Sequence, residues 1–171
     1  MSPAGRPCAG CGFDPSRVSP SDAAVAARSY PRRFRALLVR PDDEDPDVVH
    51  RRPPSGGPSA AGHALAAAAG LDAAAAALAQ VRAADDPAVD PEPAPAAGTG
   101  AGVPLEAVLE RVAGAAGALA ATIEAMHGDD WARPGRLPGD GRVTALDLAR
   151  AGVHAGVHGL RAAERTLAEV R

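Results

Sequence analysis

Aromatic side chains are scarce in this 171-residue chain, which holds one Trp, one Tyr and two Phe. The apolar fraction of 46% depends heavily on alanine, so a core must come from closely packed helices with scattered leucine and valine. Lysine and asparagine are absent, every basic residue is arginine, and the formal net charge is −3. Binding to a phosphate backbone needs a basic excess, so we expect no nucleic-acid partner.

Cysteine is equally scarce, because Cys8 and Cys11 are the whole complement. Two cysteines are too few for the disulfide scaffold of a small secreted domain. The alanine-rich run over residues 63–81 contains Asp72 and too little leucine to favour a bilayer, and no basic-then-apolar leader opens the chain. We therefore predict a cytoplasmic protein with reduced thiols and no membrane association.

Four segments have helical periodicity, and no segment alternates in the manner of a strand. The predicted helices cover residues 21–39, 58–83, about 103–128 and 144–169. Ser21 is a candidate cap of the first helix, and Pro31 should kink or split that helix. Pro58 suits a first helical turn, while Thr144 with Asp147 resembles a capping box. The third helix is the most regular, with one apolar side made of Leu105, Val108, Leu109, Val112, Ala116, Leu119 and Ile123.

Residues 84–102 separate the second and third helices with a Pro- and Gly-rich stretch, which indicates a flexible or polyproline-like connection. Such a connection is long for antiparallel neighbours. Four helices and one long crossover predict an all-α fold, a four-helix bundle over residues 21–171. Residues 1–20 lack helical or strand periodicity and are expected to form a loop-rich segment or small knuckle that carries the C-x-x-C motif.

The fourth helix carries His154 and His158 four residues apart. At 100° per residue its apolar face gathers Leu146, Val153, Val157, Leu160 and Leu167. The neighbouring stripe holds Asp147, Arg150, His154, His158, Arg161 and Arg165. Imidazoles at positions i and i+4 can bind one divalent ion together, but the same pair can also lie on a solvated, arginine-rich face. The spacing alone leaves both readings open.

A family resemblance favours the metal. The segments "CAGCGFDP", the Pro-interrupted first helix, "DDWARPGRLPGDGRVTALDLAR" and "GVHAGVHGL" follow one another as in an actinobacterial DinB-like protein. That superfamily includes mycothiol-dependent maleylpyruvate isomerase and related thiol transferases, which are four-helix bundles binding a divalent metal through three histidines. The resemblance implies that His154 and His158 are two of these ligands.

The third family ligand lies on the second helix, in a pattern similar to W-S-x-x-E-x-x-x-H. If Ser59 takes the serine position, Pro58, Gly62 and Ala66 replace the tryptophan, the glutamate and the histidine. His63, one turn earlier, becomes the candidate third ligand if the helix slides or the metal sits lower. A metal held by two histidines alone would exchange easily. These departures from the family pattern therefore weaken the inference of catalysis more than the inference of the fold.

Cys8 and Cys11 have the spacing of half a structural zinc site, which His50 or another chain would have to complete. As a redox pair they lack the usual strand-to-helix context, and an unassociated terminal thiol pair is the third reading. His50 and His127 lie in predicted loops without partner spacing. Trp131 is expected to anchor the loop before the fourth helix on the bundle.

Two functions of different class fit these observations. The resemblance implies a divalent ion (nickel, zinc or manganese) that binds a low-molecular-weight thiol for a transferase or isomerase reaction with an electrophile, with Arg150 or Arg161 available for a substrate carboxylate. The same arginines are equally ordinary surface residues. The alternative is a non-catalytic bundle with a decayed metal site, acting as a binding or dimerisation module, and a homodimer is what the resemblance implies.

Overall fold

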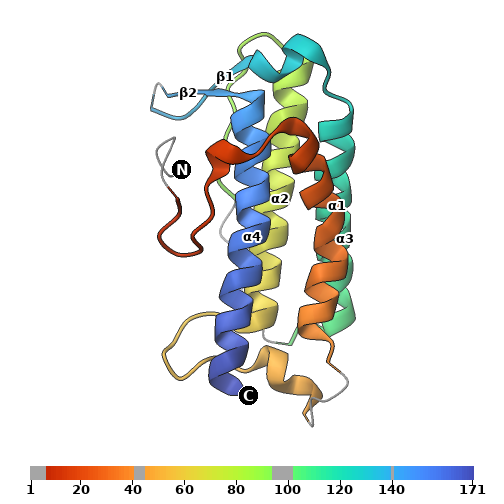
Figure 1. Ribbon diagram of the computed structural model, residues 1–171, viewed down its shortest axis with the longest axis vertical. Coiled ribbons are helices and arrows are strands. Elements are labelled where there is room, and N and C mark those ends of the chain that lie inside the picture. Colours follow the sequence, from red (N-terminus) through yellow and green to blue (C-terminus); the bar gives the residue numbers. More distant parts are fainter. Residues whose placement is uncertain (1–6, 41–44, 94–101, 140) are drawn as a thin grey trace.

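The computed structural model describes residues 7–40, 45–93, 102–139 and 141–171, apart from the side chain of Pro46. Four α-helices make up most of it, as the sequence predicts: α1 (Pro20–Leu38), α2 (Ala60–Ala83), α3 (Leu105–Glu124) and α4 (Ala145–Val170). Three short 3-10 helices accompany them: η1 (Pro15–Arg17), η2 (Pro46–His50) and η3 (Gly128–Ala132). The fold is an all-α four-helix bundle (Figure 1).

The helices do not alternate in direction along the chain. Figure 1 shows α1 and α4 running one way and α2 and α3 running the other. Because α2 and α3 are parallel, the chain must return the length of the bundle between them, and residues 84–104 span that distance. The predicted long crossover between the second and third helices is therefore confirmed.

The start and the continuity of α1 differ from the sequence prediction. Ser19, not Ser21, is the N-cap, and its side chain forms a capping box with Asp22. The helix runs unbroken through Pro31, so the predicted split is wrong. Proline removes one helical hydrogen bond there, but the fully buried rings of Tyr30 and Phe34 hold the same turns against the bundle.

The buried face of α4 consists mainly of small residues. A Cβ atom added to Gly156 would lie 2.3 Å from the Tyr30 ring, and one on Gly159 would lie 2.5 Å from the Ala67 Cβ atom. Leu148 is fully buried, whereas Leu146 is only partly buried. Three of the five predicted face residues, Val153, Leu160 and Leu167, are buried. The buried face extends beyond the prediction because glycine and alanine let α1 and α2 approach closely there.

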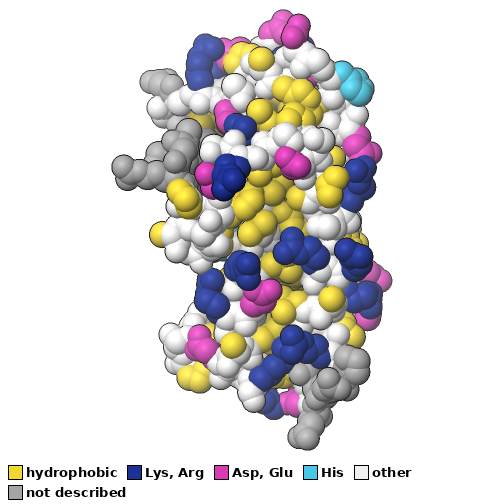
Figure 2. All heavy atoms as spheres, viewed as in Figure 1, with side chains coloured by type: hydrophobic (Ala, Val, Ile, Leu, Met, Phe, Trp, Pro, Cys, Tyr) yellow, Lys and Arg dark blue, Asp and Glu magenta, His cyan; other side chains and the backbone are white. Residues whose placement is uncertain are grey.

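The seam between α1 and α4 is closed by Tyr30, whose hydroxyl donates a 2.7 Å hydrogen bond to the carbonyl of Val153. Burial raises the pKa of this phenol well above its usual range. Apolar side chains gather along the middle of this side of the molecule, with arginines on both sides of them (Figure 2).

A short hairpin that the sequence pattern does not predict precedes α4. Strands β1 (Pro134–Arg136) and β2 (Arg142–Thr144) pair antiparallel, with Gly135 opposite Val143. Three-residue strands rich in Gly and Pro have too little alternation to be recognised. The backbone N–H of Val89 also donates to the Arg136 carbonyl at 2.8 Å, so this part of the connection after α2 is docked and not flexible.

One further feature agrees with expectation, and another departs from it. Trp131, in η3, packs partly buried against the core, as predicted for the anchor of this loop. Helix α2 is long and apolar enough to cross a membrane by length and composition, yet 56% of its most apolar window is buried inside the bundle. That burial is typical of the central helix of a soluble bundle.

Candidate metal centre

Helix α4 carries His154 and His158 on the side turned away from the bundle core. Their rings meet edge to face with centroids 5.6 Å apart, as expected one helical turn apart. The positions lie roughly opposite the buried glycines of the same helix when counted at 100° per residue. His158 is exposed and His154 is half-buried, so something other than the bundle covers His154.

The cover is a tight turn over residues 8–13, which we call the knuckle. The carbonyl of Cys8 accepts from the N–H groups of Cys11 (3.3 Å) and Gly12 (2.7 Å), and the Cys8 N–H donates to the Phe13 carbonyl (2.8 Å). Gly12 has φ of +70°, a conformation that glycine adopts without steric cost. These hydrogen bonds turn both cysteine side chains toward the same point.

The knuckle docks directly on the histidines of α4. The Phe13 ring stacks on the His154 ring, with centroids 6.0 Å apart and planes 4° from parallel. A Cβ atom on Gly10 would lie 3.0 Å from His158 Cε1, so a residue without a side chain suits this close approach. Arg165 donates a 3.0 Å hydrogen bond to the Gly10 carbonyl.

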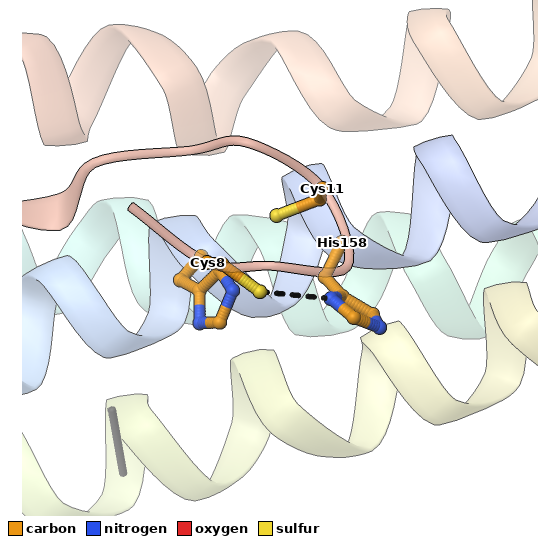
Figure 3. Close-up of side chains that lie close together, drawn as sticks. Cys8, Cys11 and His158 are labelled. Atoms are coloured by element: carbon orange, nitrogen blue, oxygen red, sulfur yellow. Dashed lines mark hydrogen bonds between the residues drawn. The ribbon is translucent and has the colours of Figure 1, made fainter. Parts of the chain in front are cut away.

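Docking brings two separate motifs into one group of ligand atoms. One ligand atom from each of Cys8, Cys11, His154 and His158 lies within 4.8 Å of all the others. The Cys8 Sγ atom is 3.7 Å from His158 Nδ1 (Figure 3). Tetrahedral zinc, with bonds of about 2.3 Å to sulfur and 2.0–2.1 Å to nitrogen, separates its ligand atoms by about 3.3–3.8 Å.

His154 supplies an independent test of whether a metal fits here. Its Nε2 atom is buried and has no hydrogen-bond partner among the described residues. A buried polar atom without a partner carries a desolvation cost, which a bound cation would offset. The four side chains therefore fit a metal ion in donor chemistry, and the 3.7 Å between Cys8 Sγ and His158 Nδ1 matches the spacing of zinc ligands.

The electrostatics favour histidines that can bind a metal. Burial lowers the pKa of the His154 imidazole, and the neighbouring His158 lowers it further. Burial also lowers the pKa of His63, with contributions from His158 and Arg165. A neutral imidazole has a free ring nitrogen, which is the form that coordinates metals.

The two cysteines differ in their electrostatic surroundings. Burial raises the pKa of the Cys11 thiol. Burial acts on Cys8 in the same sense, but hydrogen bonds from the backbone N–H groups of Cys11 and Gly10 and from the Cys11 side chain outweigh it, so the pKa of Cys8 is lowered. Cys8 is thus the thiol more readily converted to the thiolate that metals bind.

The structure brings together only some of the residues that the sequence singles out. Among the described residues, no other His, Cys, Asp or Glu joins the group of four. His63 is half-buried on α2 beside α4 and lies outside the group, and Ala66 is exposed. His50 is in η2, its buried Nδ1 atom has no hydrogen-bond partner within the described part of the chain, and it does not complete the cysteine pair. His127 is exposed ahead of η3.

The two arginines considered for substrate binding have other partners. Arg150 donates to the carbonyls of Val18 (3.1 Å) and Ser16 (3.0 Å) and so fixes the chain between the knuckle and α1. Arg161 is exposed and pairs with Glu164 at 3.1 Å, one turn along α4. Arg161 is therefore an ordinary surface residue, whereas Arg150 holds the N-terminal segment on α4.

Comparison with known proteins supports the fold and the family. A solved structure is similar over 84% of this chain and 85% of the other, with a TM-score of 0.67 and 11% identity. It is YfiT from Bacillus subtilis, described as a probable metal-dependent hydrolase with an unusual four-helix bundle topology. No curated protein matches the chain.

The sequence model of the DinB superfamily matches residues 27–160, which include both histidines of α4 but neither cysteine of the knuckle. The candidate centre therefore joins a part of the chain that matches this family to an N-terminal segment that precedes the match. Because this match covers most of the chain and the fold is a four-helix bundle, the chain belongs to the DinB superfamily.

Proposed function

We propose that this protein binds one zinc ion through Cys8, Cys11, His154 and His158. The observation that carries the proposal is the convergence of two half-sites, far apart in sequence, with all four ligand atoms within 4.8 Å. Two thiolates with two imidazoles are a ligand set that zinc favours, whereas manganese prefers oxygen ligands. Zinc is therefore favoured over manganese, and the thiolates make it the first choice over nickel.

The proposed ion has a structural role. Four protein ligands close a tetrahedral zinc site, while catalytic zinc sites keep one position for water or substrate. The ion would attach the knuckle to α4 and hold the N-terminal segment on the bundle. This arrangement supports a metal-stabilised binding or structural module more than a thiol-dependent transferase or isomerase.

A catalytic alternative would need an open coordination position. The solved relative is described as a probable metal-dependent hydrolase, and hydrolysis or thiol transfer here would require His63 to replace the cysteines, giving three histidines and a free position. His63 lies beside α4, close enough to His158 for the two side chains to interact electrostatically, so substitution of His63 tests this alternative.

The test is the metal content of the reduced, untagged protein, measured by mass spectrometry in the wild type and in four variants. We expect about one zinc per chain in the wild type, and a loss of tenfold or more in Cys11→Ser and His154→Ala. His63→Ala and the exposed control His127→Ala should keep the wild-type content. Retention in Cys11→Ser combined with loss in His63→Ala would replace the four-ligand site with the three-histidine alternative.

A further inference from the structure

We propose that the knuckle is a redox-controlled strap: a hydroperoxide oxidises Cys8 and Cys11 to an intramolecular disulfide, which releases the zinc ion and detaches the knuckle from α4. The inference rests on the zinc site proposed above. It adds a hydroperoxide as the regulator of that site, and it adds the exposure of His154 and His158 as the consequence of oxidation.

The turn allows the disulfide to form without rearrangement of the bundle. The hydrogen bond from the Cys11 N–H to the Cys8 carbonyl closes a tight turn, and the two sulfur atoms belong to a group whose members lie within 4.8 Å of one another. The end residues of such a turn have Cα atoms less than about 7 Å apart, and a disulfide needs about 4.4–6.8 Å. Both cysteines lie on one short turn, so closure needs only local movement.

The cysteines are accessible to a small oxidant. Both side chains are half-buried, and the residues between them, Ala9 and Gly10, are small and exposed. Figure 3 shows both sulfur atoms on the same loop, with Cys8 directed toward His158. A hydroperoxide can therefore approach the sulfur atoms from the solvent side of the turn. The opposite side of the turn faces α4.

The chemistry balances with one peroxide per pair of thiolates. One thiolate attacks an oxygen of hydrogen peroxide, the O–O bond breaks, and a sulfenic acid and hydroxide form. The second thiolate attacks the sulfenic sulfur, forms the S–S bond and expels a second hydroxide. Two protons convert the hydroxides to water, so the sulfurs lose two electrons and the peroxide gains them.

Oxidation leaves the knuckle with few remaining contacts. A disulfide no longer supplies thiolates, and two histidines alone hold zinc weakly. The stacking of Phe13 on His154, the partial packing of Phe13 against the core and the hydrogen bond from Arg165 to the Gly10 carbonyl then remain. Further along, Arg150 still holds the carbonyls of Ser16 and Val18. Release is therefore expected for the knuckle and not for η1 or α1.

The experiment treats the zinc-loaded, full-length protein with stoichiometric hydrogen peroxide. A chromogenic chelator measures zinc release, and intact-protein mass spectrometry measures the loss of two hydrogen atoms per disulfide. We expect one zinc released per disulfide formed, faster amide exchange in the knuckle with unchanged exchange in the middle of α4, and full reversal by a dithiol reductant with added zinc.

The outcomes separate this inference from the zinc site itself. A reduced wild type that contains no zinc and takes up none when zinc is added refutes the proposed site. A wild type that contains zinc but keeps it under peroxide refutes the switch alone. Release that accompanies sulfinic acids or disulfides between chains, without reversal by the reductant, also refutes the switch and leaves the zinc site standing.

Discussion

Helix α4 packs on two opposite sides by different means. On the inner side, Gly152, Gly156 and Gly159 lie against side chains of α1, α2 and α3 with no room for an added methyl group. On the outer side, the knuckle contributes one ring, that of Phe13, a few hydrogen bonds and the two thiols. Burial of apolar surface is enough to hold α4 against the other helices on the inner side, whereas the knuckle buries little apolar surface on the outer side.

The comparison separates stability from metal binding within one helix. The four-helix bundle should fold without zinc, since its core contacts involve none of the proposed ligands. The knuckle should depend on zinc, as small segments without a core commonly do. Changes on the inner side should therefore affect unfolding of the whole domain, and changes on the outer side should act locally.

The largest effect is expected on the inner side, for Gly156→Ala. The added Cβ atom would lie 2.3 Å from the ring of Tyr30, which is fully buried and fixed by its hydrogen bond to Val153. Overpacking of this kind costs about 1–3 kcal/mol, and the fixed ring places this change near the upper end. Urea unfolding should show this loss in the free energy of unfolding.

The matched control is Gly117→Ala on α3, where the added Cβ atom meets nothing within 4 Å. Alanine should stabilise that exposed helical position by about 0.5–1 kcal/mol. Equal effects of the two substitutions would contradict the close approach of α1 to α4.

Removal of the metal should act on the outer side alone. After chelation, amide exchange over residues 8–13 should accelerate at least about tenfold, a local change of about 1.4 kcal/mol, while far-UV circular dichroism keeps the helical signal. The measurement is hydrogen exchange by mass spectrometry with and without zinc. Cooperative loss of helicity on chelation would show that the bundle itself depends on the ion, against the separation of the two sides.

The sequence predicts the bundle well, because periodicity and caps act locally. The buried residues of α3 include most of the predicted apolar side, and Thr144 with Asp147 forms the expected capping box. The face of α4 is harder to predict, since leucine and valine mark only part of it. The spacing of Gly152, Gly156 and Gly159 was the available signal of close helix packing.

The candidate centre was only half predictable. The spacing of His154 and His158 leaves both a metal pair and a solvated face open, and half a zinc site is one of three readings of Cys8 and Cys11. No motif in the sequence joins the two pairs. Nothing local determines that residues 8–13 lie on residues 154–158, because the docking depends on tertiary contacts such as those of Arg165 and Phe13. A chain with only one cysteine pair and one closely spaced histidine pair offers a hint that the two pairs share one metal ion.

The smallest effect is expected between the two sides, at Arg150. This side chain donates to the carbonyls of Ser16 and Val18, which are far from it in sequence, and so ties the end of the N-terminal segment to α4. Arg150→Ala should cost about 1 kcal/mol in urea unfolding, since two carbonyls, one of them exposed to solvent, lose a charged donor.

Arg161→Ala is the control, because an exposed pair with Glu164 contributes about 0.5 kcal/mol or less. The zinc content of Arg150→Ala should stay at the wild-type value, because the knuckle's own hydrogen bonds, its contacts with Arg165 and His154, and the four ligands are unchanged. Loss of zinc in Arg150→Ala would mean that the contacts of Arg150 next to η1, and not the knuckle's own contacts with α4, hold the knuckle in place. The segment from Cys8 to the start of α1 would then dock on α4 as one cooperative unit.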